Sequence, residues 1–207
     1  WMDYLQRGLE PTVHNALDTT PVVIIEGARA SGKTTMCARI AEQRGFRDTV
    51  DLTDPALRSL AQADPVRFVG GLQTPAFIDE AQLVGGITLG VKAALDGGTT
   101  PGRFLLTGSA RLGRGVLGGS DPLAGRVQRL RLTPFAQAEI ERLPTSRLTH
   151  LLESPDLTAT SFSETRDRTV RRAQTGGLPT MSGVLQGRRR TVPEQEFQAY
   201  VEGVLHR

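Results

Sequence analysis

The chain has 207 residues, of which 38% are hydrophobic and 23% are charged, and this length allows one full domain with a small addition. No apolar run approaches the roughly 18 residues that span a bilayer, so we expect no contact with membranes. The ordinary composition also excludes coiled-coil and wholly disordered proteins. The single cysteine, Cys37, cannot form an internal disulfide, and no signal-peptide pattern opens the chain. These features favour a cytoplasmic protein.

The formal net charge of +3 conceals two asymmetries. Of the 25 basic side chains, 23 are arginine and only two are lysine, Lys33 and Lys92. Because the chain uses arginine for nearly all its basic positions, a lysine is expected where arginine cannot supply the same chemistry. Residues 1–103 have a net charge of −2 and residues 104–207 a net charge of +5. The basic second half is therefore suited to contact with a polyanion, although it does not require one.

Apolar runs and helical periods alternate along the first two thirds of the chain. Loosely helical spacing over residues 3–18 is broken by Pro11. Strands are predicted at residues 22–25, 46–52, 76–79, 103–107 and 127–132, and helices at 33–44, 87–95 and from the Asp-Pro pairs at 54 and 64. Strands separated by helices indicate an α/β fold with a parallel sheet of about five strands.

The pattern becomes wholly helical after Thr133. Helices are predicted at residues 134–143, 147–152, 163–174, 179–185 and 193–206, and loops at 108–119 and 154–161. We therefore divide the chain into an N-terminal helical segment at residues 1–20, an α/β core at 21–142, and a small all-helical lid or linker at 143–207.

One glycine-rich segment matches the phosphate-loop pattern GxxxxGK[ST], and it lies between a predicted strand and a predicted helix. In such a loop, consecutive backbone amides and the start of a helix bind phosphate oxygens. The predicted nucleotide-binding residues are Gly27, Ala28, Arg29, Ala30, Ser31, Gly32, Lys33, Thr34 and Thr35. We expect Lys33 to act on the β and γ phosphates and the Thr34 hydroxyl to ligate Mg²⁺. The plainer alternative is a glycine turn that fits the pattern by chance.

Two adjacent acids follow the predicted strand at residues 76–79. Ligands bind where parallel strands end, so Asp79 is predicted to hold Mg²⁺, through a water, and Glu80 to orient or deprotonate an attacking water. A small-molecule kinase needs no water-activating glutamate, so Glu80 favours ATP hydrolysis over phosphoryl transfer. The alternative is a strand end with ordinary solvated acids.

A third predicted strand ends in the hydroxyls of Thr107 and Ser109. Either hydroxyl is a candidate for contact with the γ-phosphate and the attacking water, and we assign Ser109 to the catalytic set. Such residues are also common in ordinary turns. Arg126 is a candidate for neutralising phosphate charge, in the same chain or across a subunit interface, and a plain surface arginine is the alternative.

Four segments stand in order along the chain: GARASGKT, FIDEAQ, FLLTGSA and DPLAGRVQRLRLTPFAQAE. Together they resemble a prokaryotic family of AAA-type ATPases in which an ATP-binding core precedes an uncharacterised C-terminal domain. The resemblance implies a P-loop fold of the additional-strand catalytic-glutamate type, with the Asp79 strand beside the Thr107 strand and the phosphate-loop strand next to that. It also implies that the chain is truncated before a further domain.

The leading hypothesis is an ATP-binding, Mg²⁺-dependent ATPase that moves or gates an effector domain. One alternative is a nucleotide-gated DNA-binding module that uses the basic second half and turns over little ATP. Another is a small-molecule kinase, which Glu80 disfavours. The expected ligands are ATP and Mg²⁺, and a homo-oligomer is compatible with Arg126 acting between subunits.

Overall fold

A computed structural model describes residues 4–108 and 123–142, together with 166, 167, 170, 176–178, 195, 198, 199 and 202. The chain divides into two compact units, each described here by itself. The sheet unit consists of Leu9–Ala28 and Gly32–Leu132, and the terminal unit consists of Trp1–Gly8, Arg29–Ser31 and Thr133–Arg207.

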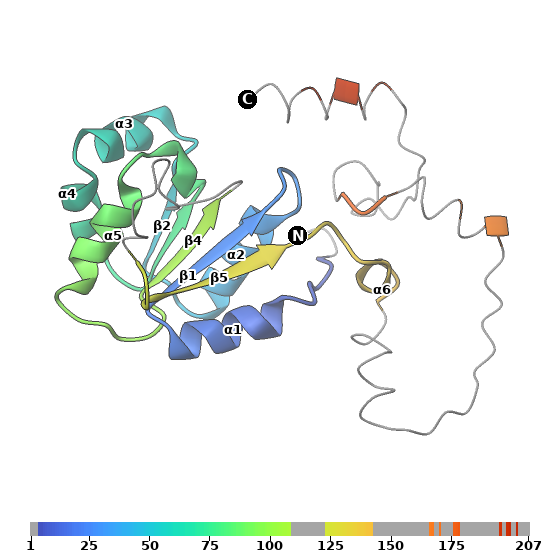
Figure 1. Cartoon of the computed structure of the whole chain (residues 1–207), viewed down its shortest axis with the longest axis horizontal. Helices are drawn as coiled ribbons and strands as arrows, with labels where there is room; N and C mark the ends of the chain where they lie inside the picture. Colours follow the sequence, from blue (N-terminus) through green and yellow to red (C-terminus); the bar gives the residue numbers. More distant parts are fainter. Residues whose placement is uncertain are drawn as a thin grey trace. The chain divides into compact units, whose positions relative to one another are not determined.

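The sheet unit contains one parallel sheet of five strands in the order β2-β3-β4-β1-β5 (Figure 1). The strands are β1 (Val22–Gly27), β2 (Asp48–Asp51), β3 (Ala76–Asp79), β4 (Phe104–Gly108) and β5 (Val127–Leu132). All five strand predictions are confirmed, and the observed ends differ from the predicted ones by at most two residues. The order β3-β4-β1 is the one that the resemblance to AAA-type ATPases implies.

Helices cover both faces of this sheet, and period-two alternation along the strands divides the core between them. On one face, Val23 and Ile25 of β1 pack with buried residues of α1 (Glu10–Thr19) and α2 (Lys33–Gln43). On the other face, Val22 and Ile24 pack with α3 (Pro55–Ala63), α4 (Pro65–Gly70) and α5 (Ile87–Leu95). Val22 to Ile25 of β1 are fully buried, so both faces of this part of the strand lie in the core, which explains its continuous apolar run.

Proline and aspartate set the starts of three helices. Asp54 and Asp64 accept hydrogen bonds from amides in the first turns of α3 and α4, as the Asp-Pro pairs predict. The helical spacing of residues 3–18 was expected to be broken at Pro11, and α1 indeed begins at Glu10 with Pro11 in its first turn, while residues 4–9 are not helical. A proline is tolerated in the first turn because the amide that it lacks has no helical partner there.

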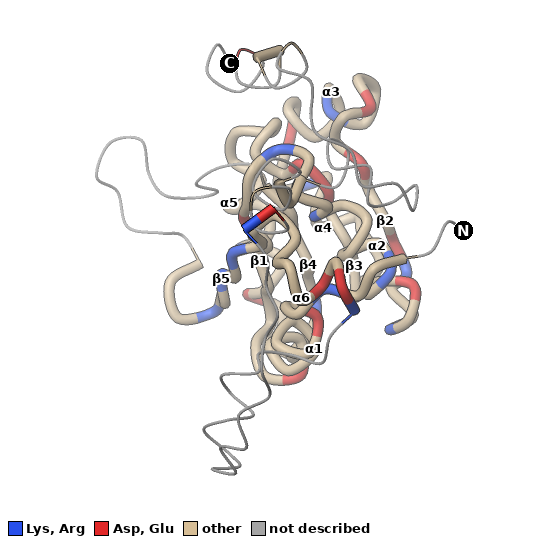
Figure 2. Tube along the Cα trace, turned by 90° about the vertical axis from the view of Figure 1, so that its right-hand side faces the viewer, with Lys and Arg blue, Asp and Glu red and all other residues tan. Residues whose placement is uncertain are grey.

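The edge strand β5 carries Arg129 and Arg131, and Figure 2 shows basic residues along it. The Arg129 guanidinium pairs with the Glu26 carboxylate of β1 at 3.1 Å. Charged side chains on an edge strand oppose pairing with another chain. This explains why the run alternates between apolar and basic residues and is only half-buried over most of its length.

The helical predictions beyond Thr133 are covered only in part. Helix α6 (Gln137–Ile140) falls within the predicted 134–143 helix. The described positions 166, 167, 170, 195, 198, 199 and 202 are helical, in agreement with the predicted helices at 163–174 and 193–206. The predictions at 147–152, 154–161 and 179–185, and the loop from 109 onward, lie outside the described residues. Among those described, no helix has the length and apolarity needed to cross a bilayer.

Gly90 sits where α4 and α5 come into close contact. A Cβ at Gly90 would lie 2.4 Å from the Pro65 carbonyl oxygen and 2.9 Å from Val69 Cγ2. Gly90→Ala is therefore expected to destabilise the fold by about 1–3 kcal/mol, against the usual preference of helices for alanine. Urea unfolding measures this change. Gly70→Ala in α4 is the matched control, since a Cβ there meets nothing within 4 Å; equal losses in the two variants would contradict the explanation.

Candidate functional site

The phosphate loop joins β1 to α2. Ala30 and Gly32 both have left-handed backbone conformations, with φ of 58° and 93°. These angles turn the chain sharply between a buried strand and a helix, and glycine adopts such an angle at low cost. Lys33 is the first residue of α2 and is only 4% exposed. Its Nζ donates to the carbonyl oxygens of Gly27 and Ala28, each at 3.0 Å, so the first two residues of the loop bind the ammonium group.

Three hydroxyl groups lie in or next to this loop. Thr34 and Thr35 are exposed in the first turn of α2. Ser31 is fully buried, and within the described part of the chain its Oγ has no hydrogen-bond partner. A buried hydroxyl without a partner is costly unless a ligand or water satisfies it. The loop therefore has unused hydrogen-bonding capacity at the position where the sequence predicts phosphate.

Asp79 ends β3 as a buried carboxylate, 4% exposed. Its Oδ1 accepts a hydrogen bond from the Thr107 hydroxyl at the end of β4. Burial raises the pKa of Asp79, hydrogen bonds from Thr107 and Thr34 lower it, and the nearby charges of Glu80 and Asp51 raise it further. A cation at this carboxylate would favour its charged form.

Glu80 follows in a left-handed conformation, with φ 51° and ψ 40°. Non-glycine residues adopt this region rarely and at a cost. The Glu80 N–H donates to Thr107 Oγ1 at 3.0 Å, and the Glu80 carboxylate accepts from the Gln82 side-chain amide. Thr107 thus donates to the Asp79 carboxylate and accepts from the Glu80 backbone amide, so that a single hydroxyl links the two residues.

Strand register explains why these side chains meet. Ile25 of β1 is paired with Thr107 of β4, and Ile78 of β3 is paired with Leu106. The ends of β1, β3 and β4 therefore lie at the same edge of the sheet. Predicted residues from all three strands reach this edge, whereas Ser109 lies outside the described residues.

Arg126 lies at the opposite end of the strands, where β1 and β5 begin. It immediately precedes β5, whose first residue, Val127, pairs with Val22 at the start of β1. Its guanidinium forms an exposed ion pair with Asp96 at 3.1 Å. This placement does not fit a role beside Asp79 in the same chain, because parallel strands carry their two ends at opposite edges. The role across a subunit interface stays a prediction.

Comparison with known protein families covers the part of the chain that contains these site residues. The family described as "AAA domain" matches residues 19–141. The chain belongs to the AAA domain family. The resemblance to prokaryotic AAA-type ATPases is thereby confirmed, and the α/β P-loop fold with it.

Two curated relatives, uncharacterised proteins of Mycobacterium tuberculosis and Mycobacterium bovis, are each 31% identical over 143 residues. That match covers 69% of this chain and 32% of each relative, so it spans about a third of their length. Among solved structures, a Walker-type ATPase of Pyrococcus abyssi superposes with a TM-score of 0.55 and 15% identity, covering 99% of this chain and 74% of that one. The likeness at this identity concerns the fold alone.

Two contacts in this AAA domain were not anticipated from the sequence. Thr107 was a candidate for contact with the γ-phosphate, which stays a prediction; its hydroxyl donates to the Asp79 carboxylate and accepts from the Glu80 N–H. Gln82 was not singled out, although it stands in the same FIDEAQ run, two residues after Glu80. The only sequence feature that pointed to Gln82 was its side-chain amide, two residues from the Glu80 carboxylate. Cys37, by contrast, is buried in the core, and burial raises the pKa of its thiol, which opposes reactivity.

Thr107→Val tests the link between the acids. Valine keeps the shape but leaves the buried Asp79 carboxylate without its donor and the Glu80 amide without its acceptor. We expect a loss of about 1–3 kcal/mol in the free energy of unfolding, measured in urea. Thr107→Ser keeps the hydroxyl and is expected to retain most of the stability. A valine variant as stable as the wild type would mean that the link contributes nothing to the fold.

Proposed function

We propose that the chain is an Mg²⁺-dependent ATPase core that binds ATP through residues 27–35 and hydrolyses its terminal phosphate. The observation that carries this proposal is the Thr107 hydroxyl, which joins Asp79 and Glu80 at the strand edge from which the phosphate loop starts. A metal-binding acid and a water-activating acid are the two groups that nucleotide hydrolysis needs beside a phosphate loop. We place this core at residues 21–142.

The residues present fit a triphosphate with its metal ion. Thr34 and Asp79 offer hydroxyl and carboxylate oxygens, the hard donors that Mg²⁺ prefers. The unpartnered Ser31 hydroxyl and the loop amides suit phosphate oxygens. Bound Mg²⁺ would neutralise charge on the β and γ phosphates. We assign metal binding to Thr34 and Asp79 on this chemistry.

Lys33 supplies the compact positive charge of the site. In this structure its ammonium is held by the carbonyls of Gly27 and Ala28 within the loop. We propose that it exchanges these neutral acceptors for phosphate oxygens, which form stronger, charge-assisted hydrogen bonds.

Glu80 is the proposed general base. Glu80 directly follows Asp79 in a left-handed backbone conformation, and the Gln82 side-chain amide donates a hydrogen bond to its carboxylate. We propose that this contact orients the carboxylate, which accepts a proton from the attacking water. Ser109 keeps its proposed role in contact with that water.

The direct test is phosphate release from ATP by the purified chain, with Mg²⁺ and with EDTA in its place. Turnover that requires Mg²⁺ and yields only ADP and inorganic phosphate supports the proposal. No binding of Mg·ATP or Mg·ADP by calorimetry at millimolar concentration would overturn it. Transfer of the phosphate to an added metabolite would instead favour the kinase.

The effector and the partner of this core are also proposals. We propose that hydrolysis drives or gates an effector domain, and the alternative is a nucleotide-gated module that binds DNA through the basic second half. The charge of +5 over residues 104–207 favours that alternative. Duplex DNA binding that weakens steeply between about 50 and 200 mM salt would support it, and a flat response would contradict phosphate contacts.

A further inference from the structure

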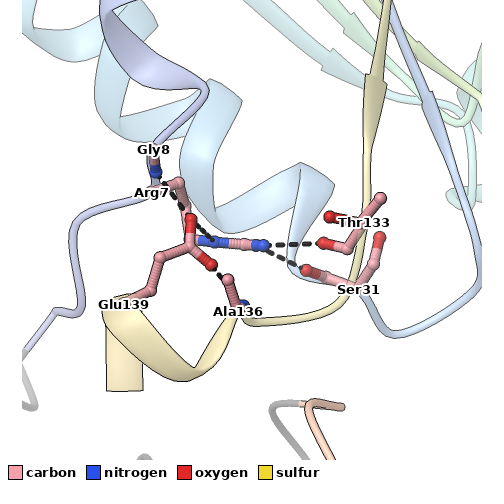
Figure 3. A network of polar contacts seen from close by, with 6 residues as sticks. All are labelled: Arg7, Gly8, Ser31, Thr133, Ala136 and Glu139. Atoms are coloured by element: carbon pink, nitrogen blue, oxygen red, sulfur yellow. Dashed lines mark hydrogen bonds and ion pairs between the residues drawn. The ribbon is translucent and has the colours of Figure 1, made fainter. Parts of the chain in front are cut away.

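Arg7 is an arginine buried within the terminal unit, with only 3% of its surface exposed. Figure 3 shows its guanidinium directed at two backbone carbonyl groups. Nη1 donates to the Ser31 carbonyl oxygen at 2.8 Å, and Nη2 donates to the Thr133 carbonyl oxygen at 2.6 Å. Ser31 belongs to the phosphate loop, 24 positions along the chain. The side chain therefore bridges a loop residue and the segment that follows β5.

The charge of Arg7 is balanced on its other side. Glu139 Oε1 accepts from Arg7 Nε at 3.3 Å and from the Gly8 N–H at 2.6 Å, while its Oε2 accepts from the Ala136 N–H at 2.8 Å. The guanidinium also lies over the Phe135 ring, 4.3 Å from its centre. Such a rigid, planar fork holds several acceptors in one geometry, which lysine cannot do. The arrangement fixes Arg7 before any ligand binds.

Fixing the Ser31 carbonyl also fixes the amide of the next residue. In a trans peptide the C=O of Ser31 and the N–H of Gly32 share one plane and point in opposite directions. When Arg7 holds the carbonyl oxygen, the Gly32 N–H must point away from Arg7. In the phosphate-loop pattern the Gly32 amide is one of those that bind phosphate. Gly32 has no side chain and a φ of 93°, so the residue itself does little to restrict this plane.

We propose that Arg7 is a positioning residue for the phosphate loop. It holds the Ser31–Gly32 peptide plane in the orientation that phosphate requires, so that less ordering remains to be done when a nucleotide binds. The inference rests on the proposed nucleotide binding by residues 27–35. It adds a residue that lies outside the loop motif and has no contact with substrate of its own.

Arg7→Ala tests the inference through the affinity for Mg·ADP, measured by calorimetry. We expect the dissociation constant to rise about tenfold or more, because a charged hydrogen bond to the loop is lost. Arg7→Lys restores one charged donor without the fork and is expected to recover part of the affinity. Arg44→Ala is the matched control, since Arg44 forms an ion pair with Asp18 on the surface of the sheet unit; it should bind like the wild type.

Turnover separates positioning from a general loss of structure. Glu80 lies on a different loop, so Arg7→Ala should raise KM for ATP while kcat at saturating ATP changes by less than about twofold. Urea unfolding without nucleotide identifies a variant that fails to fold. If Arg7→Ala does not fold, the affinity of Arg7→Lys for Mg·ADP is the test. A folded Arg7→Lys variant with wild-type affinity overturns the inference.

The outcomes distinguish the two proposals. A wild type that binds Mg·ADP, with a folded Arg7→Ala that binds equally well, overturns the role of Arg7 and leaves the nucleotide site standing. A wild type that fails to bind Mg·ADP overturns both. A lower kcat with unchanged KM and dissociation constant would also contradict positioning of the phosphate loop.

Discussion

Lys33→Ala is expected to raise the dissociation constant for Mg·ATP by about 100-fold, the largest effect on binding in this chain. A charged hydrogen bond contributes about 1.5–3 kcal/mol, and each 1.4 kcal/mol corresponds to a factor of ten. Lys33 also bonds to two loop carbonyls, so alanine removes both the phosphate contact and a restraint on the empty loop. Calorimetry with Mg·ATP, or with a non-hydrolysable analogue, measures the change.

The second lysine of the chain provides the control. Lys92 is exposed in the last turn of α5, away from the phosphate loop in the sequence. Lys92→Ala removes the same side chain and the same unit of net charge, and we expect the affinity for Mg·ATP to stay within about twofold of the wild type. Equal losses in the two variants would indicate a general charge effect. An unchanged affinity for Mg·ATP in Lys33→Ala would contradict the assignment of residues 27–35 as the phosphate loop.

The sheet could be predicted because local sequence and tertiary burial agree there. Val22 to Ile25 form a continuous β-branched run, and the structure buries both faces of that strand. The helix over Ile87–Leu95 matches its apolar period at both ends. Pro11 marks the point where the helical spacing of residues 3–18 breaks, because a proline is tolerated in the first turn of a helix but not in its interior.

The missed contacts depend on pairings that no local pattern encodes. Arg7 is one of 23 arginines, and its carbonyl partners lie 24 and 126 positions away. Thr107 and Ser109 offer the same hydroxyl chemistry in sequence. Only the register of β4 against β1 and β3 shows that Thr107 reaches both acids. Residue types predicted the chemistry of the site, whereas strand register and long-range packing decided which side chains touch.

Glu80→Gln is expected to lower kcat for ATP hydrolysis by about 10²–10⁴-fold, the range that a general base contributes. Glutamine keeps the size of the side chain and an oxygen that can accept from Gln82, so the fold and the Asp79–Thr107 contact should persist. It cannot take a proton from water at neutral pH. Phosphate release at saturating ATP measures kcat, and calorimetry with Mg·ATP measures binding in the same variant.

Lys33→Ala and Glu80→Gln should separate binding from chemistry. Glu80→Gln is expected to bind Mg·ATP within about threefold of the wild type, because Glu80 acts on the water and not on the phosphates. Gln82→Ala retains the carboxylate but loses the donor that orients it, so its kcat should fall by about tenfold, less than in Glu80→Gln. Wild-type turnover in Glu80→Gln would show that another group accepts the proton. Full turnover in Gln82→Ala alone would show that Glu80 needs no orienting partner.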